Sequence, residues 1–195
     1  MRLIYSLILI ILLAKAYSQD TYFEAGLNLS SYDFKSPQLS DNLKLSPSNA
    51  IFFRFGLSDY YSPSINYGLS FQQFNASGEQ SNYLFDWKTN YIGGFFQYNV
   101  FLNRKESFYI NSSLEILTLL SGKQMSYGEV YKLSEEDEFS GVWLNPRLGL
   151  TYNLIDSRSL TLGVIFNFSY SMNLINDTDQ KLSFLTNQLG IRFML

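Results

Sequence analysis

One stretch of this 195-residue chain, residues 159–173, alternates apolar and small polar side chains with a period of two. One face carries only apolar or aromatic residues: Leu160, Leu162, Val164, Phe166, Phe168, Tyr170 and Met172. The other face carries Thr161, Gly163, Ile165, Asn167, Ser169 and Ser171. Because successive side chains of a β-strand point to opposite sides, this pattern predicts a strand with one apolar and one polar face.

The same alternation recurs along most of the chain. We expect eight strands, at residues 22–30, 50–58, 64–73, 86–101, 107–117, 140–154, 159–173 and 186–195. After the N-terminal segment, no window is continuously apolar over the roughly 20 residues that a transmembrane helix needs, so a helical membrane protein is excluded. The chain is therefore expected to be all-β.

The connections between these strands alternate in length. Short polar turns are expected at residues 59–63, 103–106 and 155–158, and longer loops at residues 35–49, 75–82, 121–138 and 173–181. Short turns at one end and longer loops at the other are typical of bacterial outer-membrane barrels with an even number of antiparallel strands. We predict an eight-stranded antiparallel up-and-down transmembrane β-barrel. The alternatives are an antiparallel sandwich and a soluble lipocalin-type barrel.

The orientation of the two strand faces distinguishes these alternatives. A soluble barrel turns its apolar face inward, whereas a membrane barrel turns it toward lipid. Eight strands enclose room for side chains or one small ligand, and the bulky Phe, Tyr and Leu face is too large for that space. We therefore expect the small polar face inside. Aromatic residues near the short turns fit an interfacial girdle: Tyr22, Tyr60, Tyr61, Phe101, Phe108, Tyr152 and Phe193.

Two features predict local irregularities in the strands. The Gly93-Gly94 pair suggests a bulge or bend. Pro146 donates no backbone hydrogen bond, and a closed barrel has no edge strand to accommodate it, so we expect a bulge there as well.

The N-terminus has the features of a secretory signal peptide. Arg2 precedes an apolar core of Leu3 to Leu13, followed by small residues, with cleavage expected after Ser18 or, as a second choice, Ala16. The apolar run is too short for a transmembrane anchor. We expect a signal peptide at residues 1–18 and one barrel domain at residues 19–195. The remaining chain is acidic, which does not suggest nucleic-acid binding.

Three parts of the chain carry a resemblance to a known family: the signal peptide ending near Gln19, the block NPRLGLTYNL from Asn145 to Leu154, and the final LGIRFML. With these, the chain resembles the small eight-stranded outer-membrane barrels of the OmpX and OmpA-transmembrane-domain type, in particular their relatives in Bacteroidota. The resemblance implies localisation in the cell outer membrane, contact with outer-membrane lipid, and insertion by the barrel-assembly machinery. Such barrels usually end in an aromatic residue, whereas this chain ends at Leu195.

The residue types present exclude most catalytic sites. The chain has no His and no Cys, so Ser–His hydrolysis, thiol chemistry and thiolate metal sites are excluded. Carboxylate chemistry at Glu24, Glu115 or the acidic residues of the loops remains in principle, and no nucleophile with a base and an orienting group accompanies it. We therefore expect no enzyme, no cofactor and no metal. We interpret the acidic run SEEDEF, Ser134 to Phe139, as a solvated loop; the alternative is a divalent-cation site.

Five charged residues fall on the polar faces of the predicted strands: Glu24, Arg54, Glu115, Arg147 and Arg192. Buried charges require partners, so we expect ion pairs across the lumen. Counting residues from the short turns places Glu115 beside Arg147, and Glu24 beside Arg192 where the last strand meets the first. Eight-stranded barrels have no free channel, which favours a closed plug of ion pairs over a conducting gate.

Three functions remain open from the sequence. The first is an outer-membrane barrel with a structural, adhesive or partner-binding role in its extracellular loops, for an extracellular ligand or envelope protein that the sequence does not identify. The second is a narrow pore for small solutes. The third is a soluble lipocalin-like carrier with its aromatic residues turned inward around a lipophilic ligand.

Overall fold

The computed structural model describes residues 20–35, 43–58, 64–80, 83–157, 160–174 and 181–194. The predicted signal peptide at residues 1–18, the turn at residues 59–63 and the terminal Leu195 lie outside these ranges. Within them, no helix is long and apolar enough to cross a membrane.

Ten strands and one short 3-10 helix are formed by the residues in these ranges. In chain order they are β1 (Asp20–Lys35), β2 (Leu43–Ser48), β3 (Ala50–Ser58), β4 (Ile65–Gln80), β5 (Tyr83–Phe101), β6 (Phe108–Ser126), β7 (Glu129–Lys132), η1 (Leu133–Glu135), β8 (Val142–Asp156), β9 (Thr161–Asn173) and β10 (Lys181–Met194).

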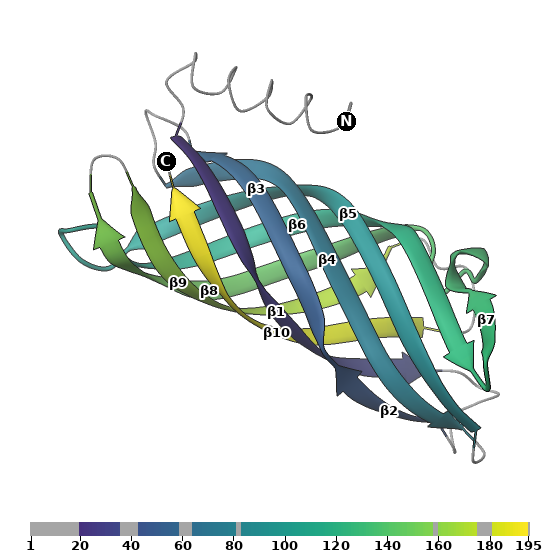
Figure 1. Ribbon diagram of the computed structural model, residues 1–195. Coiled ribbons are helices and arrows are strands. Elements are labelled where there is room, and N and C mark those ends of the chain that lie inside the picture. The colour runs from purple at the N-terminus through teal and green to yellow at the C-terminus, as the bar shows by residue number, and fades with distance from the viewer. Residues whose placement is uncertain are drawn as a thin grey trace, which may run out of the picture.

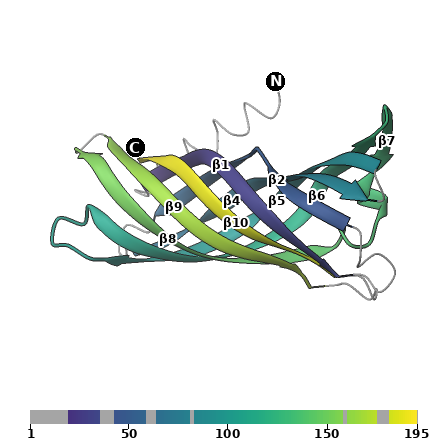
Figure 2. The ribbon, with the colours of Figure 1, turned by 90° about the horizontal axis from the view of Figure 1, so that it is seen from below.

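Eight of these strands form a closed antiparallel barrel (Figures 1 and 2). Each pairs with the next along the circuit β1, β3, β4, β5, β6, β8, β9 and β10, and the last strand pairs with the first from Tyr22↔Met194 to Lys35↔Lys181. The predicted fold class is confirmed, including the pairing of the C-terminal strand with the N-terminal one.

The two remaining strands extend the barrel at its long-loop end. Both β3 and β2 pair with β4: β3 with residues 66–72 of β4, and β2 with residues 75–80. Asn49 separates β2 from β3 in the chain. β7 pairs with the end of β6 through a two-residue turn in which Tyr127 and Gly128 both have positive φ. Positive φ at both central residues is the mark of a type I′ hairpin turn.

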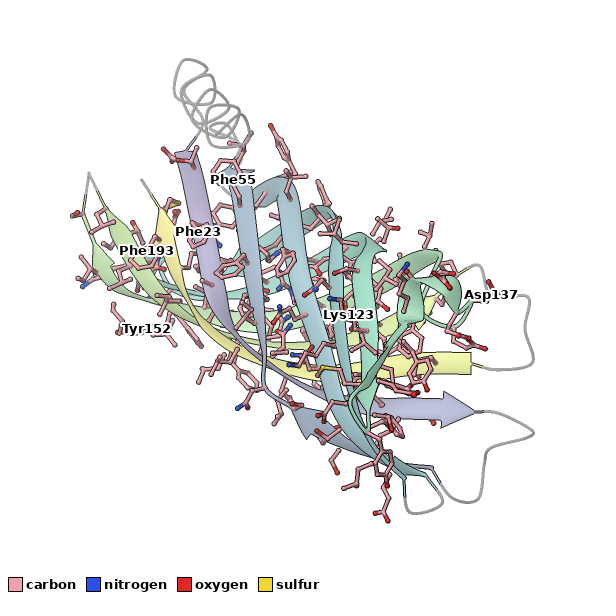
Figure 3. All side chains as sticks on the ribbon, turned by 45° about the vertical axis from the view of Figure 1, so that its right-hand side comes forward. Phe23, Phe55, Lys123, Asp137, Tyr152 and Phe193 are labelled. Atoms are coloured by element: carbon pink, nitrogen blue, oxygen red, sulfur yellow. The ribbon has the colours of Figure 1, made fainter. Side chains whose placement is uncertain are left out.

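The strand faces are oriented as the alternation predicted. On β9, Val164, Phe166, Phe168 and Tyr170 are exposed, whereas the intervening residues from Thr161 to Ser171 are buried. The other barrel strands repeat this arrangement, and the outward side chains surround the ribbon in Figure 3. Tyr152 and Phe193 lie near the short-turn end, and Asp137 lies at the opposite end.

Several local predictions are wrong. The loop predicted at residues 75–82 is mostly strand, because β4 and β5 stay paired up to Gln80↔Tyr83. Gly93 and Gly94 pair regularly with Leu117 and Ile116, and the irregularity lies at Asn90/Tyr91, where the register shifts.

Pro146 causes no bulge. It pairs with Leu114 on β6. On the β9 side the register is the same before and after it, Leu144↔Met172 and Arg147↔Ser169, with no pairs between. Proline has no backbone N–H to donate, so the pairing between β8 and β9 is interrupted at Pro146. No extra residue is inserted in either strand, so the register is kept.

Tyr22 does not belong to an interfacial girdle. It is 1% exposed and points into the barrel, where its ring occupies the space above Gly56. Phe52 does the same above the Gly26–Gly190 pair: a Cβ at either glycine would lie within 2.9 Å of the Phe52 ring. These glycines therefore make room for large rings in an interior that side chains already fill.

Candidate functional site in the barrel lumen

The five charged residues predicted to face inward lie together in the lumen. They come from five different strands: Glu24 from β1, Arg54 from β3, Glu115 from β6, Arg147 from β8 and Arg192 from β10. Each is at most 5% exposed. Strand alternation turns each side chain inward, and the antiparallel register brings them to similar heights along the barrel.

Arg54 joins the two carboxylates. Its Nη1 lies 2.9 Å from Oε2 of Glu24, and its Nε lies 3.1 Å from Oε1 of Glu115. Nη1 also donates a hydrogen bond of 2.8 Å to the side-chain oxygen of Gln97. The guanidinium carbon stands 3.6 Å from the centroid of the Phe95 ring, so one face of the cation is covered by an aromatic ring.

Arg147 contacts the same two carboxylates from the opposite wall. Its Nη2 lies 3.3 Å from Oε1 of Glu115 and 4.0 Å from Oε2 of Glu24. Its Nε donates to Ser113 and its Nη1 to Gln188, at 3.1 and 2.8 Å. On the backbone, Arg147 faces Ser113, and Glu115 faces Asn145, so the contact is diagonal and depends on the length of the arginine side chain.

Glu115 also accepts hydrogen bonds from neutral donors. Asn145 donates to Oε2 at 2.7 Å, Gln72 donates to the same oxygen at 3.3 Å, and Ser70 donates to Oε1 at 3.3 Å. A carboxylate that is fully buried among two arginines and three neutral donors has replaced most of its lost hydration.

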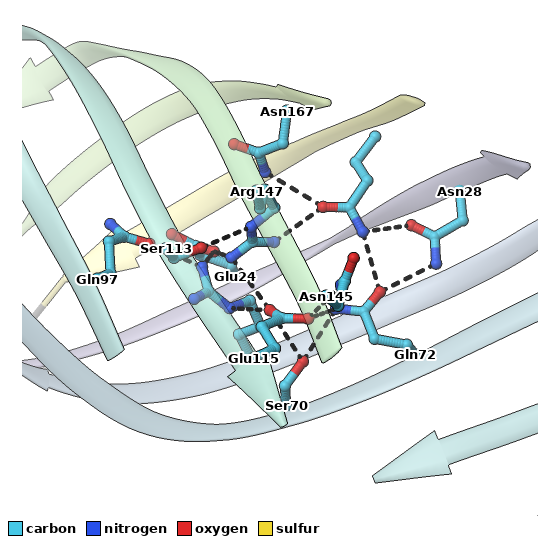
Figure 4. A network of polar contacts seen from close by, with 12 residues as sticks. Glu24, Asn28, Ser70, Gln72, Gln97, Ser113, Glu115, Asn145, Arg147 and Asn167 are labelled. Atoms are coloured by element: carbon cyan, nitrogen blue, oxygen red, sulfur yellow. Dashed lines mark hydrogen bonds and ion pairs between the residues drawn. The ribbon is translucent and has the colours of Figure 1, made fainter. Parts of the chain in front are cut away.

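A chain of amides extends the network across the lumen (Figure 4). Gln188 on β10 donates to both Asn28 on β1 and Gln72 on β4, each at 2.9 Å. Gln72 in turn donates to Ser70 at 2.9 Å. The alternation of the sequence identifies a polar face but does not say which amides on different strands lie at the same height.

Arg192 lies apart from the other two arginines. Its Nη1 is 3.6 Å from Oε1 of Glu24 and has no hydrogen-bond partner. Its guanidinium carbon lies 3.8 Å from the centroid of the Tyr22 ring. The described lumen cluster therefore holds three arginines and two glutamates, and Arg192 has an ion-pair contact with only one of the glutamates.

Above the charges, toward the long loops, the interior is apolar. A buried cluster there contains Phe74, Ala76, Phe85, Trp87, Tyr91, Leu117, Leu133, Phe139, Trp143, Leu182 and Phe184. Trp143 and Phe184 stack with ring centroids 4.6 Å apart. The expectation of a small polar face throughout the interior is thus wrong for this end.

The acidic loop contributes to this apolar layer. Leu133 and Phe139, which flank the acidic residues, are 3% and 4% exposed, and the Phe139 carbonyl accepts hydrogen bonds from Tyr91 and Trp143. Glu135, Glu136 and Asp137 between them are exposed. Among the described residues, no group of three acidic side chains is arranged to hold a metal ion.

The fold resembles small outer-membrane barrels of known structure. OprG from Pseudomonas aeruginosa is 12% identical, with 91% of this chain and 96% of that chain covered, at a TM-score of 0.53. Ail of Yersinia pestis, in complex with the heparin analogue sucrose octasulfate, is 15% identical over 91% and 99%, also at 0.53. Neisserial surface protein A is 11% identical over 89% and 95%, at 0.52.

No protein-family model matches the chain, and no curated protein sequence matches it. At these low identities the likeness to solved structures concerns the fold. The chain has the architecture of the small eight-stranded outer-membrane β-barrels.

Proposed function

We propose that this chain is an integral barrel of the bacterial outer membrane, with a lumen closed by ion pairs and a loop end that binds an extracellular partner. The observation that carries the proposal is the division between its two surfaces. Outward side chains on different strands, such as Leu69, Phe96, Leu148 and Phe166, are 49–58% exposed, whereas the charged side chains point inward. Lipid is the solvent that suits such an exterior.

The lumen is closed by two successive layers. The charged and amide network connects strands from all sides of the barrel, and the aromatic cluster fills the interior above it. Opening a channel through the network requires breaking ion pairs between groups at most 5% exposed, which is costly. A narrow pore is therefore the weaker proposal. An inward-facing aromatic pocket of the lipocalin kind is disfavoured because the largest apolar surface faces outward.

The loop end carries the features of a contact surface. In β7 and its turn, Tyr127, Val130 and Tyr131 are 74%, 58% and 51% exposed. Exposed aromatic and aliphatic residues beyond the membrane suggest a protein partner. The adjacent acidic residues Glu135 and Glu136 disfavour a polysulfated ligand like the one bound by Ail.

The other proposed partners follow from the membrane location. They are outer-membrane lipid around the barrel and the barrel-assembly machinery during insertion. The relationship to barrels of Bacteroidota also remains a proposal. No catalytic role and no cofactor are proposed, because the chain offers no nucleophile activated by a base.

Site-directed labelling tests the orientation. The chain has no native cysteine, so Phe166→Cys and Asn167→Cys each introduce one label position. After reconstitution in lipid vesicles, a fluorophore at position 166 should be quenched by a lipid-soluble quencher, and one at position 167 should not. Equal quenching at both positions, or recovery of folded protein without detergent, would contradict a membrane barrel.

Conductance tests the closed lumen. The wild-type barrel in planar bilayers should give no stable channel openings. A stable pore whose conductance is unchanged when Glu115 is replaced by Gln would show that the network does not block the lumen.

A further inference from the structure

Three lysines form a row across the outer face of the sheet at the loop end. Lys88 on β5 pairs with Lys123 on β6, and Lys123 pairs with Lys132 on β7. All three are exposed, and Figure 3 labels Lys123, the middle one. Paired residues of adjacent strands project from the same side of a sheet, with Cβ atoms about 4.5–5.5 Å apart. We call these three residues the lysine row.

The lysine row faces away from the lumen. Trp87 and Thr89, the chain neighbours of Lys88, are buried, and so is Gly122 beside Lys123. Because successive side chains of a strand point to opposite faces, the lysines project outward. Leu133, which follows Lys132, belongs to the buried apolar cluster, so the acidic segment after β7 turns back toward the interior.

The fold places these like charges directly opposite one another, which destabilises a sheet. Among the described residues, neither Lys88 nor Lys123 has a carboxylate within ion-pair distance. Lys132 Nζ lies 3.6 Å from Oε1 of Glu135, but both side chains are 72% exposed, so water and salt screen this pair. The row is therefore suited to an anion that contacts more than one lysine.

Protection of a free strand edge does not explain the row. Lysines on an edge strand prevent it from pairing with other chains, and this applies to Lys132 on β7. Lys88 and Lys123 lie on β5 and β6, and each of these strands pairs on both sides. Two of the three lysines thus have no role in guarding an edge.

The height of the row indicates where the anion comes from. The outward residues of β5 below the row are apolar or Gly: Ile92, Gly94, Phe96, Tyr98 and Val100. The surface turns polar at Asn90, which accepts a hydrogen bond from Gln73 at 2.9 Å and donates one to Ser121 at 2.8 Å. Lys88 lies two residues further on, or about 7 Å along the strand. The headgroup layer on each side of a bilayer is about 5–8 Å thick, so the row lies at headgroup level.

We propose that the lysine row binds the phosphate groups of anionic lipid in the outer leaflet, with the acyl chains of that lipid against the apolar wall below Asn90. The inference rests on the proposed function, because it requires the barrel to lie in a bilayer, and it assigns one class of lipid to one wall. Lysine ammonium groups donate charge-assisted hydrogen bonds to phosphate oxygens, and adjacent lysines can share one phosphate.

Quenching by spin-labelled lipids tests the proposal. The chain has no native cysteine, so Ile92→Cys places a fluorophore below the row. Leu185→Cys places one on the outer face of β10, four strands from β5 in both directions around the barrel. Each labelled barrel is reconstituted in phosphatidylcholine nanodiscs with a small fraction of phosphatidic acid or phosphatidylcholine that carries a nitroxide on its acyl chain.

At position 92, spin-labelled phosphatidic acid should quench at least threefold more efficiently than spin-labelled phosphatidylcholine, and at position 185 the two lipids should quench equally. Equal quenching by the two lipids at position 92 overturns the proposal and leaves the membrane barrel intact. Absence of quenching at both positions contradicts the membrane barrel itself, and the lipid site with it. Excess inorganic phosphate should not change the preference at position 92; its loss would indicate a site for free phosphate and overturn the lipid proposal.

Variants of the row identify the residues responsible. Lys123→Gln should lower the preference for phosphatidic acid at position 92 at least twofold, and Lys88→Gln, Lys123→Gln and Lys132→Gln together should abolish it. Arginine at all three positions should preserve it. Arg104→Gln with Lys105→Gln, two exposed cations of the short turn between β5 and β6, is the control and should behave like wild type.

Heat-modifiable migration on gels checks that each variant is folded before labelling. If the triple Gln variant fails to fold, Lys123→Gln decides alone, and an unchanged preference in that variant overturns the proposal. An equal loss of preference in Lys123→Gln and in the Arg104→Gln, Lys105→Gln control also overturns it, because it would indicate an effect of net charge.

Discussion

At the residue scale, Arg54 makes the two shortest ion pairs of the described interior. It is 1% exposed and lies about 3 Å from both buried carboxylates. The sequence predicts that Arg54 points inward but not which residues it contacts, because the partners of a long side chain depend on the heights of residues across the barrel. The position of a residue in a strand predicts which face its side chain occupies, but not its height relative to residues on the other strands.

Replacing Arg54 by Met should lower the free energy of unfolding by about 3–5 kcal/mol, because Glu24 and Glu115 stay buried while losing their closest cation. Urea-dependent unfolding in lipid vesicles, followed by heat-modifiable migration, measures the change. Arg104→Met, at an exposed turn position, is the matched control. Adding Glu115→Gln to Arg54→Met should recover part of the loss; a fully additive double variant would show that the two residues do not interact.

The glycine beneath Phe52 gives a second test at this scale. In Gly190→Ala the new Cβ would lie 2.9 Å from the Phe52 ring and 2.4 Å from the Ala25 carbonyl oxygen, so we expect a loss of about 1–3 kcal/mol. Gly94→Ala is the control, since the nearest atom to its Cβ would be 3.6 Å away. The same urea series compares the two, and similar losses in both would mean that strand propensity, not the Phe52 contact, determines the effect.

At the scale of elements, the strands are longer than the alternation indicated. β5 and β6 each span 19 residues, whereas a tilted strand crosses a membrane with about 9–11. Residues 75–80 and 121–126 fall in predicted loops, and the first of these segments is rich in small polar residues and Gly. Such residues are also suited to a β-hairpin that extends into water, and composition alone does not distinguish a loop from such a hairpin.

The β6–β7 hairpin should be locally sensitive at its turn. Gly128 has φ +84° with open space around it, so Gly128→Val strains the backbone without a clash. We expect faster hydrogen exchange in β7 by roughly tenfold and unchanged stability of the barrel, in line with a cost of order 1 kcal/mol. Tyr127→Asn is the companion variant, because Asn tolerates the φ of 50° and should keep β7 protected. Slower exchange in Gly128→Val would contradict the type I′ turn.

At the scale of the whole molecule, the sequence predicted the barrel, its strand faces and its inward charges, and it missed the apolar layer at the loop end. The reason is that a period of two reports which face a residue occupies. The period does not report how far along the barrel axis a residue lies. Tyr91, Trp143 and Phe184 alternate with outward residues as the polar positions do, so their ring packing emerges only when the strands are placed side by side.

A charge on the outside of the barrel should act differently from one inside. Phe166→Arg places an unpaired cation on the lipid face and should cost about 2–4 kcal/mol if the position lies near the membrane midplane. Phe166→Leu, which keeps the surface apolar, is the control. Urea unfolding in vesicles measures both, and a loss below 1 kcal/mol for Phe166→Arg would place residue 166 close to the membrane surface.

Glu24 links the chemistry of the interior to the order in which the barrel is completed. Its three arginine partners come from β3, β8 and β10, and β10 is the strand that pairs with β1 to close the described barrel. Before the barrel closes, β1 is an edge strand and its Glu24 lacks the contact with Arg192 of β10. Docking of β10 supplies Arg192 and the missing backbone partners in one step, so closure of the barrel also completes the ion pairs of Glu24.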